Sequence, residues 1–297
     1  MCEFEEIKKQ LSEKSRLEDG IFVYLPEVSE FQRKEIDFHD QIHQDEEQVH
    51  QLKSLRNRYY HNYFQKWLFK NSAKPVLLEI GSGSGLDIME SLKRGAKAII
   101  SDISFQSLKS IKDKIKGKRY RDNCLYLACD GQNLPLPDSS VQTVLLVATL
   151  HHFEDQSRVL TEIKRVIQEN GLIVLAMEPS KMMMKVTKLF KNNQGLRIYD
   201  GHSEADEAHQ GYSLLDFLRF AGQSKLEIIK VKRVWLLQGF MHYGLEACYR
   251  LFKLKKRLKL PKTIEYLLLI LDEILLRLPL VKNLNWHWIV ILKKNDH

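Results

Sequence analysis

A short apolar run followed by three closely spaced glycines constrains the fold of this chain more than any other segment. Val76–Ile80 has the pattern of a buried strand, glycines occupy alternate positions from 81 to 85, and a helical pattern follows. That order predicts a glycine loop at the carboxyl end of a strand, where a nucleotide-like ligand can lie against bare backbone. A second apolar run then ends in an acid at Asp102, which makes the pair a stronger signal than a glycine loop alone.

Apolar runs and helical patterns alternate through the middle of the chain. Five such runs fall within about a hundred residues, and two more follow later. The alternation needs crossover connections and therefore predicts an α/β fold with a parallel sheet. The predicted strands are Val76–Ile80, Ala98–Ile100, Cys124–Cys129, Val141–Ala148, Leu172–Met177, Leu226–Val231 and Trp286–Leu292.

The composition is that of a globular protein with a substantial core. Of the 297 residues, 44% are hydrophobic and 28% are charged, as is usual for soluble domains. Segment 1–20 is charged throughout, and the longest uncharged runs are shorter than the roughly 18 residues of a membrane span. The four cysteines form no CxxC pair. We therefore expect a reduced, cytoplasmic protein.

The pattern divides the chain into a helical cap and a larger domain. Residues 1–74 are polar, with apolar side chains at helical spacing, so we expect helices that pack on the core or cover the site as a lid. The larger domain spans 75–297. Within it we expect a cofactor-binding core at 75–180, a lid-like segment at 181–223 and a basic and apolar helical insertion at 235–284.

Five motifs of the core occur in an order typical of one enzyme family. They are EIGSGSG at 79–85, DIS at 102–104, CDG at 129–131, LPLPD at 134–138 and ATLHHF at 148–153. With them the chain resembles the class I S-adenosylmethionine-dependent methyltransferases. It looks most like the small-molecule group that includes the ubiquinone/menaquinone-biosynthesis enzymes (methyltransferase type 11). The resemblance implies a Rossmann-like seven-stranded sheet with its last strand antiparallel, and S-adenosyl-L-methionine as cofactor.

The resemblance also implies which residues contact the cofactor. Asp102 would accept hydrogen bonds from both ribose hydroxyls, Asp130 would accept one from the adenine amino group, and Glu79 would hold the amino group of the methionine part. Each acid has a structural alternative: Asp102 as a helix N-cap, Asp130 as a turn residue and Glu79 in a buried salt bridge. The predicted cofactor-binding set is Glu79, Gly81, Ser82, Gly83, Gly85, Asp102, Ile103, Asp130, Gly131, Ala148 and Leu150.

Histidines mark the expected acceptor side. His151 and His152 follow the fourth strand and are the candidate general bases, because imidazole accepts a proton near neutral pH. The alternative is that they pack the loop and bond to its backbone. In the polar stretch Tyr199–Gly211, His202 and His209 are candidate substrate contacts. The acids and histidines of that stretch favour a charged lid over a metal site, so no metal ion is expected.

The carboxyl-terminal quarter is basic. Residues 225–297 hold 15 Lys and Arg against 6 Asp and Glu, while the remainder is nearly neutral. Lys253–Lys262 carries six basic residues and no acid, and a broad apolar helix follows it. Peripheral membrane contact through 253–281 with a small-molecule or lipid-linked acceptor is one prediction. A cap helix packed on the domain is the alternative. Few aromatics lie among the lysines, so no nucleic-acid partner is expected.

Two other functions remain open. A nicotinamide-dependent oxidoreductase shares the glycine loop and the strand-end acid, but its fingerprint requires a third glycine where this chain has Leu86. A binding protein that keeps the fold without turnover is the non-enzymatic alternative. The absence of an Asn/Asp-Pro-Pro-aromatic motif after the fourth strand, and of any Pro-Cys pair, argues against methylation of nucleic-acid bases.

Overall fold

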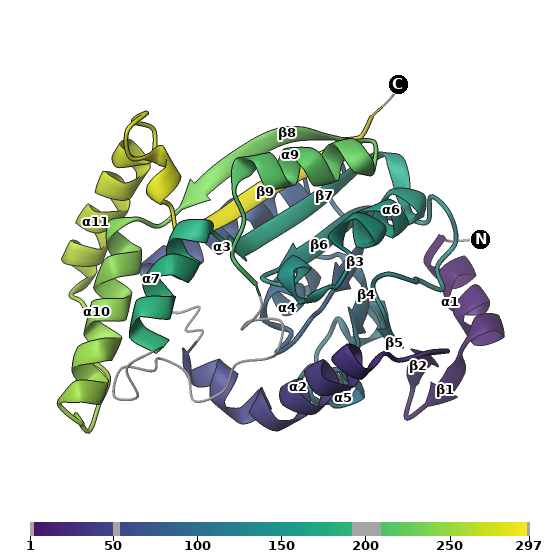
Figure 1. The fold of residues 1–297 in the computed structure, drawn as a ribbon. Helices are drawn as coiled ribbons and strands as arrows, with labels where there is room; N and C mark the ends of the chain where they lie inside the picture. Colours follow the sequence, from purple (N-terminus) through teal and green to yellow (C-terminus); the bar gives the residue numbers. More distant parts are fainter. Residues whose placement is uncertain (1–2, 50–53, 192–208, 296–297) are drawn as a thin grey trace.

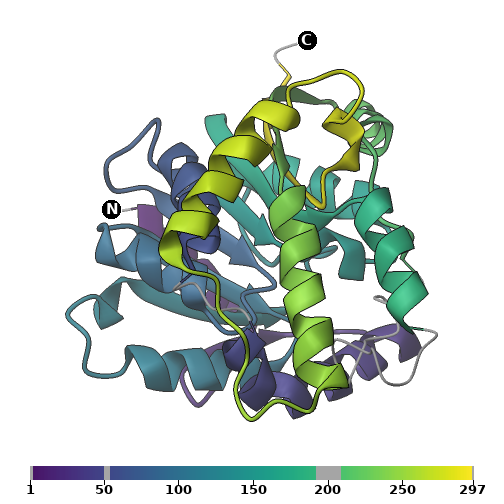
Figure 2. The same cartoon turned by 90° about the vertical axis from the view of Figure 1, so that its left-hand side faces the viewer.

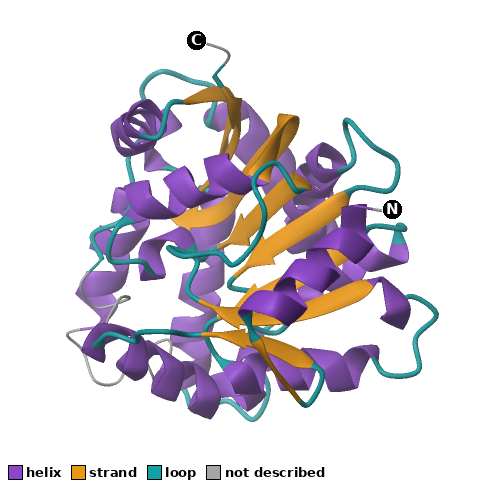
Figure 3. Ribbon diagram, turned by 90° about the vertical axis from the view of Figure 1, so that its right-hand side faces the viewer, coloured by secondary structure: helices purple, strands orange, loops and turns teal. Residues whose placement is uncertain are grey.

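A single mixed sheet lies between two layers of helices in the computed structural model, which describes residues 3–49, 54–191 and 209–295 (Figures 1 and 3). The sheet has nine strands in the order β1-β2-β5-β4-β3-β6-β7-β9-β8. Their bounds are β1 Arg16–Glu18, β2 Ile21–Tyr24, β3 Val76–Ile80, β4 Lys97–Asp102, β5 Cys124–Cys129, β6 Val141–Val147, β7 Ile167–Pro179, β8 Leu226–Val234 and β9 His287–Lys294.

The Rossmann-like α/β fold is confirmed, but the prediction of seven strands was wrong. All seven predicted strands are present, and β9 runs antiparallel to both neighbours, β7 and β8. The two additional strands come from residues 16–24, which were predicted to be helical. There Asp19 and Gly20 both adopt positive φ, as a tight hairpin turn requires. The hairpin extends the sheet because β2 pairs in parallel with β5.

Alternate residues of the central strands pack against the helix layers on opposite faces of the sheet. Leu78 and Ile80 of β3 belong to one buried cluster, whereas Leu77 belongs to the other. The first cluster includes α1 Glu3–Lys14, α6 Gln156–Val166 and α9 Leu214–Gln223. The second includes α3 Leu55–Leu68, α4 Leu86–Lys93, α5 Phe105–Ile115, α10 Leu237–Leu251 and α11 Lys262–Leu275.

The insertion before β9 is a helix pair, α10 and α11, and two acids of α11 attach it to the domain. Asp272 of α11 accepts hydrogen bonds from the backbone N–H groups of Leu236, Leu237 and Gln238, where α10 begins. These bonds satisfy donors that the first turn of a helix otherwise leaves without partners. Glu273 binds Lys232 of β8 and accepts a hydrogen bond from Tyr60 of α3. Figure 2 shows α10 and α11 on the outside of the molecule.

The remaining helices lie at the carboxyl edge of the sheet or beside it. These are α2 Glu30–Val49, α7 Lys181–Lys191 and the short 3₁₀ helix η2 Leu150–His152, with η1 Arg121–Asn123 and η4 Lys282–Leu284 elsewhere. Much of the predicted lid-like segment 181–223, including His202, lies outside the described residues. Within the described part of the chain, no helix combines the length and the apolar character needed to cross a bilayer.

Candidate cofactor and acceptor site

The glycine loop connects β3 to α4 in a backbone conformation that favours glycine. Gly81, Gly83 and Gly85 have φ values of 67°, 47° and 76°, a region where L side chains are strained. A Cβ atom at Gly81 would lie 2.3 Å from Cγ2 of Thr149, and one at Gly85 would lie 2.8 Å from Cγ1 of Ile111. The loop therefore keeps its backbone bare and closely packed, as the approach of a ligand to main chain requires.

Asp102 ties the end of β4 to the glycine loop. Its Oδ2 accepts a hydrogen bond from the Gly83 N–H at 2.8 Å, and its Oδ1 accepts one from the Ser104 N–H at 2.9 Å. The N-cap of α5 is Ser104, whose hydroxyl accepts from the Ser107 N–H. The alternative interpretation of Asp102 as the N-cap is thus wrong. Its carboxylate instead bonds to the backbone of the glycine loop.

Helix α2 crosses the carboxyl edge of the sheet and touches the ends of three strands. Gln32 donates a hydrogen bond from its amide nitrogen to Oδ2 of Asp130 at 2.8 Å, just after β5. Asp40 accepts from the Ser104 hydroxyl after β4. Glu35 reaches His152 after β6. Asp130 also accepts a hydrogen bond from the backbone N–H of Gln132. It therefore stabilises its own turn and at the same time binds the side-chain amide of Gln32.

Glu79 is a buried acid beside two other acids. It is 3% exposed, and its Oε2 has no hydrogen-bond partner among the described residues. Burial, and then the charges of Asp87 and Asp102, raise the pKa of Glu79 well above its usual value, and the Ser82 hydroxyl only partly opposes this. The structure thus does not support the salt-bridge alternative for Glu79. A buried carboxylate of this kind is costly without a cation.

We expect Glu79→Gln to stabilise the cofactor-free protein at neutral pH by about 1 kcal/mol, because the variant needs neither a bound proton nor a buried charge at this position. Since the folded-state pKa is raised, the native state holds a proton that the unfolded state loses above about pH 4.3. Stability should therefore fall as pH rises through the folded-state pKa of Glu79. Thermal unfolding between pH 4.5 and pH 8 measures this, and the variant should show a flatter profile. Identical profiles would mean that Glu79 is not the titrating group.

Buried Glu178 at the end of β7 organises the loop after β6. Its Oε1 accepts hydrogen bonds from the N–H groups of Thr149 and Leu150 at 2.9 and 2.8 Å, and its Oε2 lies 3.0 Å from Nδ1 of His151. Burial alone would raise the pKa of Glu178, but His151 and these two N–H groups lower it below its usual value. The carboxylate is therefore ionised and holds the His151 ring in place.

The other predicted histidines lie around His151. The His152 ring centroid is 4.2 Å from that of His151, and Nδ1 of His152 lies 2.9 Å from Oε2 of Glu35. The His209 ring lies 5.4 Å from His151. The structure thus brings His151, His152 and His209 together at the carboxyl edge, beside Ala148, which has a φ of 50°, and buried Leu150.

Several residues of the site were not predicted from the sequence. Glu178 had a usable signal, because it ends an apolar run in an acid just as Asp102 does. Gln32 and Glu35 are spaced like one face of a helix, but no local pattern indicates that this helix crosses the sheet edge. Gly131 and Ile103 lie where predicted, after β5 and β4, and Gly131 packs under Phe153.

A scan against protein families matches residues 78–175 to the "Methyltransferase domain" model. These residues contain the loop, both strand-end aspartates, and His151 and His152. This region is a class I methyltransferase domain of the small-molecule group. S-adenosylmethionine is the cofactor of such domains. The match covers the centre of the chain and leaves α1–α3 and the α10–α11 pair outside it.

Curated relatives support the same assignment over a similar region. The ubiquinone/menaquinone biosynthesis C-methyltransferase of Pectobacterium carotovorum is 27% identical over 131 residues, which are 43% of this chain and 48% of that protein. The demethylmenaquinone methyltransferase of Thermobifida fusca is 28% identical over 100 residues, 34% of this chain and 42% of that protein. The chain thus matches about half or less of the length of these relatives.

Solved structures share the fold at low sequence identity. The [4+2]-cyclase SpnF superposes with a TM-score of 0.62 and 13% identity, covering 91% of this chain and 98% of the cyclase. Phosphoethanolamine N-methyltransferase 2 of Haemonchus contortus, in complex with S-adenosyl-L-methionine, gives a TM-score of 0.57 and 16% identity, covering 91% of this chain and 61% of that protein.

Proposed function

We propose that the protein transfers a methyl group from S-adenosylmethionine to a small-molecule or lipid-like acceptor. The observation that carries the proposal is the Asp102 carboxylate, bonded to the bare glycine loop at the carboxyl edge of a methyltransferase domain. The curated relatives named above are methyltransferases. They give no support to the oxidoreductase alternative.

The residues present fit the cofactor. Asp130 already accepts a hydrogen bond from an amide N–H₂ group, a donor of the same kind as the adenine amino group. Glu79 offers a buried carboxylate oxygen without a partner among the described residues, which suits the ammonium group of the methionine part. A Cβ atom at Gly81 would collide with the Thr149 side chain, so glycine there keeps the loop packed against the segment after β6. The predicted roles of these residues are therefore retained as proposals.

In the proposed reaction the protein mainly positions its reactants. The bound sulfonium supplies an activated methyl group, so alignment with the attacking atom can provide most of the catalysis. Thr149 and Leu150, held through Glu178, would lie at the sulfonium end of the cofactor. Helix α2 is bonded to Asp130 at the same edge of the sheet. A proton acceptor is required only when the acceptor carries a proton on its attacking atom. His151 and His152 remain predicted for that role, and His209 for acceptor contact.

Transfer of a tritiated methyl group into small molecules of a cell lysate tests the proposal directly. We expect a labelled organic-soluble or small polar product with the wild-type protein, and much less of it with Asp102→Asn at a cofactor concentration that does not saturate the variant. Product profiling for a gain of one methyl group then identifies the acceptor. Cofactor binding without any labelled product would favour a non-catalytic role, or other chemistry on the same fold, of which the [4+2]-cyclase SpnF is an example.

We also propose a cytoplasmic protein that contacts a membrane through α11 and the loop before it. The outer face of α11 exposes large apolar side chains, among them Leu267 at 59% and Ile274 at 54% exposed, while its inner side buries Leu269 and Asp272. The six basic residues of 253–262 immediately precede or begin this helix in the sequence. An apolar face beside a basic segment suits an anionic lipid surface, and a lipid-like acceptor would be found there.

Liposome flotation tests the membrane contact. We expect the protein to float with vesicles containing anionic lipid at low salt, and to be released by about 0.5 M salt, because each basic side chain near the surface contributes about 1 kcal/mol. Leu267→Glu combined with Leu271→Glu should abolish flotation. Leu215→Glu, at a 75% exposed leucine of α9, is the matched control. Equal flotation of all three proteins would contradict the assignment.

A further inference from the structure

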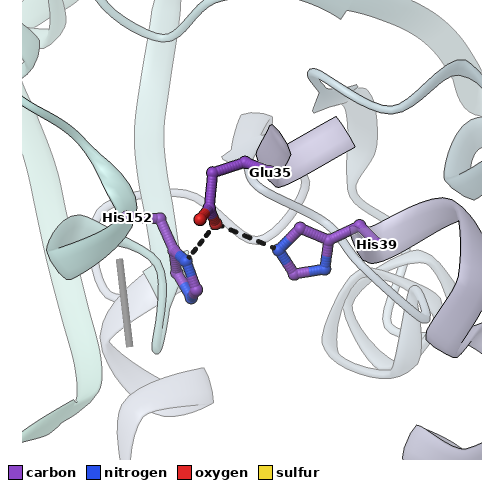
Figure 4. Close-up of side chains that lie close together, drawn as sticks. All are labelled: Glu35, His39 and His152. Carbon is purple, nitrogen blue, oxygen red and sulfur yellow. Dashed lines mark hydrogen bonds and ion pairs between the residues drawn. The ribbon is translucent and has the colours of Figure 1, made fainter. Parts of the chain in front are cut away.

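Two histidines and one glutamate converge where α2 meets the end of β6. Oε2 of Glu35 lies 2.9 Å from Nδ1 of His152 and 3.8 Å from Nε2 of His39, as Figure 4 shows. The three ligand atoms lie within 4.8 Å of one another. Nitrogen and oxygen ligands of a tetrahedral ion bound at about 2.1 Å are about 3.4 Å apart. Small side-chain rotations would therefore place all three around one cation.

The three residues come from elements that the fold fixes against each other. Glu35 and His39 lie four positions apart, on one face of α2. The Gln32–Asp130 and Asp40–Ser104 contacts hold this helix on the sheet edge. His152 belongs to η2, whose first backbone N–H is bonded to buried Glu178. The convergence is thus a product of tertiary structure and does not depend on an exposed loop.

The cluster differs from the other histidine–carboxylate pairs of the structure in having two imidazoles at one carboxylate. The pair His151–Glu178 and the pair His61–Asp87 each join one imidazole to one carboxylate, at 3.0 and 2.7 Å. At Glu35 a second imidazole nitrogen is aimed at the same oxygen, from 3.8 Å, which is too far for a hydrogen bond. Of the described residues, only Glu35, His39 and His152 form a group with metal-ligand spacing.

We propose that Glu35, His39 and His152 bind a divalent transition-metal ion such as Zn²⁺ or Fe²⁺. Two imidazoles and one carboxylate are donors that such ions prefer, and three protein ligands leave coordination positions open. Glu35 is 4% exposed, whereas both histidines are partly exposed and leave the site accessible. This assignment departs from the expectation that the chain binds no metal, and from the base role of His152.

The proposed metal site lies beside His151, where the methyl acceptor is expected to bind. A cation there could therefore activate the acceptor. A hydroxyl group bound to it would have a lowered pKa and could lose its proton to solvent, without a protein base. The acceptors favoured by this arrangement are therefore oxygen compounds with a hydroxyl or carbonyl group. The proposal concerns binding of the ion, so it stands or fails independently of methyl transfer.

Metal titration of the full chain, without a histidine tag and stripped with a chelator, tests the site. We expect one equivalent of Zn²⁺ to bind in isothermal titration, and one equivalent of Co²⁺ to give visible absorption bands. His39→Ala and His152→Ala should each weaken Zn²⁺ binding by at least about 10-fold. His61→Ala, which removes a histidine paired with Asp87 outside the cluster, should bind Zn²⁺ as the wild type does.

The same titrations can overturn the proposal. Absence of stoichiometric binding to the wild-type protein, or binding that survives all of the cluster variants, would contradict it. Circular dichroism of each variant separates a lost ligand from a lost fold. The His39 side chain is partly exposed, so His39→Ala should fold normally. It keeps the test decisive if His152→Ala does not fold.

Discussion

Asp102→Ala is expected to lower the affinity for S-adenosylmethionine on the order of 100-fold. In the proposed complex the carboxylate accepts hydrogen bonds from two ribose hydroxyls, and bonds to a charged acceptor contribute about 1.5–3 kcal/mol each. Its bonds to the N–H groups of Gly83 and Ser104 also shape the loop. Isothermal titration calorimetry measures the affinity of both proteins under the same conditions.

Asp102→Asn is the matched control for the shape of the loop. The amide oxygen can keep one backbone bond, so this variant should fold like the wild type and still bind the cofactor at least about 10-fold more weakly. Thermal unfolding of the cofactor-free proteins separates the two effects. Wild-type affinity in either variant would remove Asp102 from the cofactor site.

Glu178→Ala is expected to lower the free energy of unfolding by about 3 kcal/mol. The substitution leaves two buried N–H groups, of Thr149 and Leu150, and the His151 ring without their acceptor. Each unsatisfied buried group costs about 1–3 kcal/mol, partly relieved by local relaxation. Chemical denaturation measures the change. The loop 149–152 should also become disordered, which should abolish methyl transfer.

Glu178→Gln separates the contribution of the two backbone hydrogen bonds from that of the negative charge at this position. Because both backbone bonds go to Oε1, the glutamine can keep them through its carbonyl oxygen and should lose only about 1 kcal/mol of stability. Its amide group would face Nδ1 of His151 in place of a charged oxygen. If the alanine variant is as stable as the glutamine variant, the role of Glu178 in holding the loop is wrong.

The positions of the proposed cofactor residues at the strand ends could be predicted because that information is local. Each of Glu79, Asp102 and Asp130 stands at or just after the end of an apolar run, and the carboxyl ends of parallel strands meet at one sheet edge. The glycine spacing fixes the loop between β3 and α4 from a few consecutive residues. The structure places all of these at the positions predicted for them.

The acceptor side depends on contacts between distant segments. His152 meets Glu35 across 117 positions and Gln32 meets Asp130 across 98, and no periodicity encodes such pairings. The hairpin at 16–24 is a different case, since Asp19-Gly20 is a local turn signal. There the polar character of the amino-terminal region favoured a helical interpretation over that signal.

Titration of the wild-type protein with S-adenosylmethionine and, separately, with NAD tests the central claim most directly. That claim is that the bare loop at 81–85 and the Asp102 carboxylate hold a sulfonium nucleoside. We predict saturable binding of one equivalent of S-adenosylmethionine and no heat of binding with NAD. Binding of NAD without binding of S-adenosylmethionine would contradict the claim.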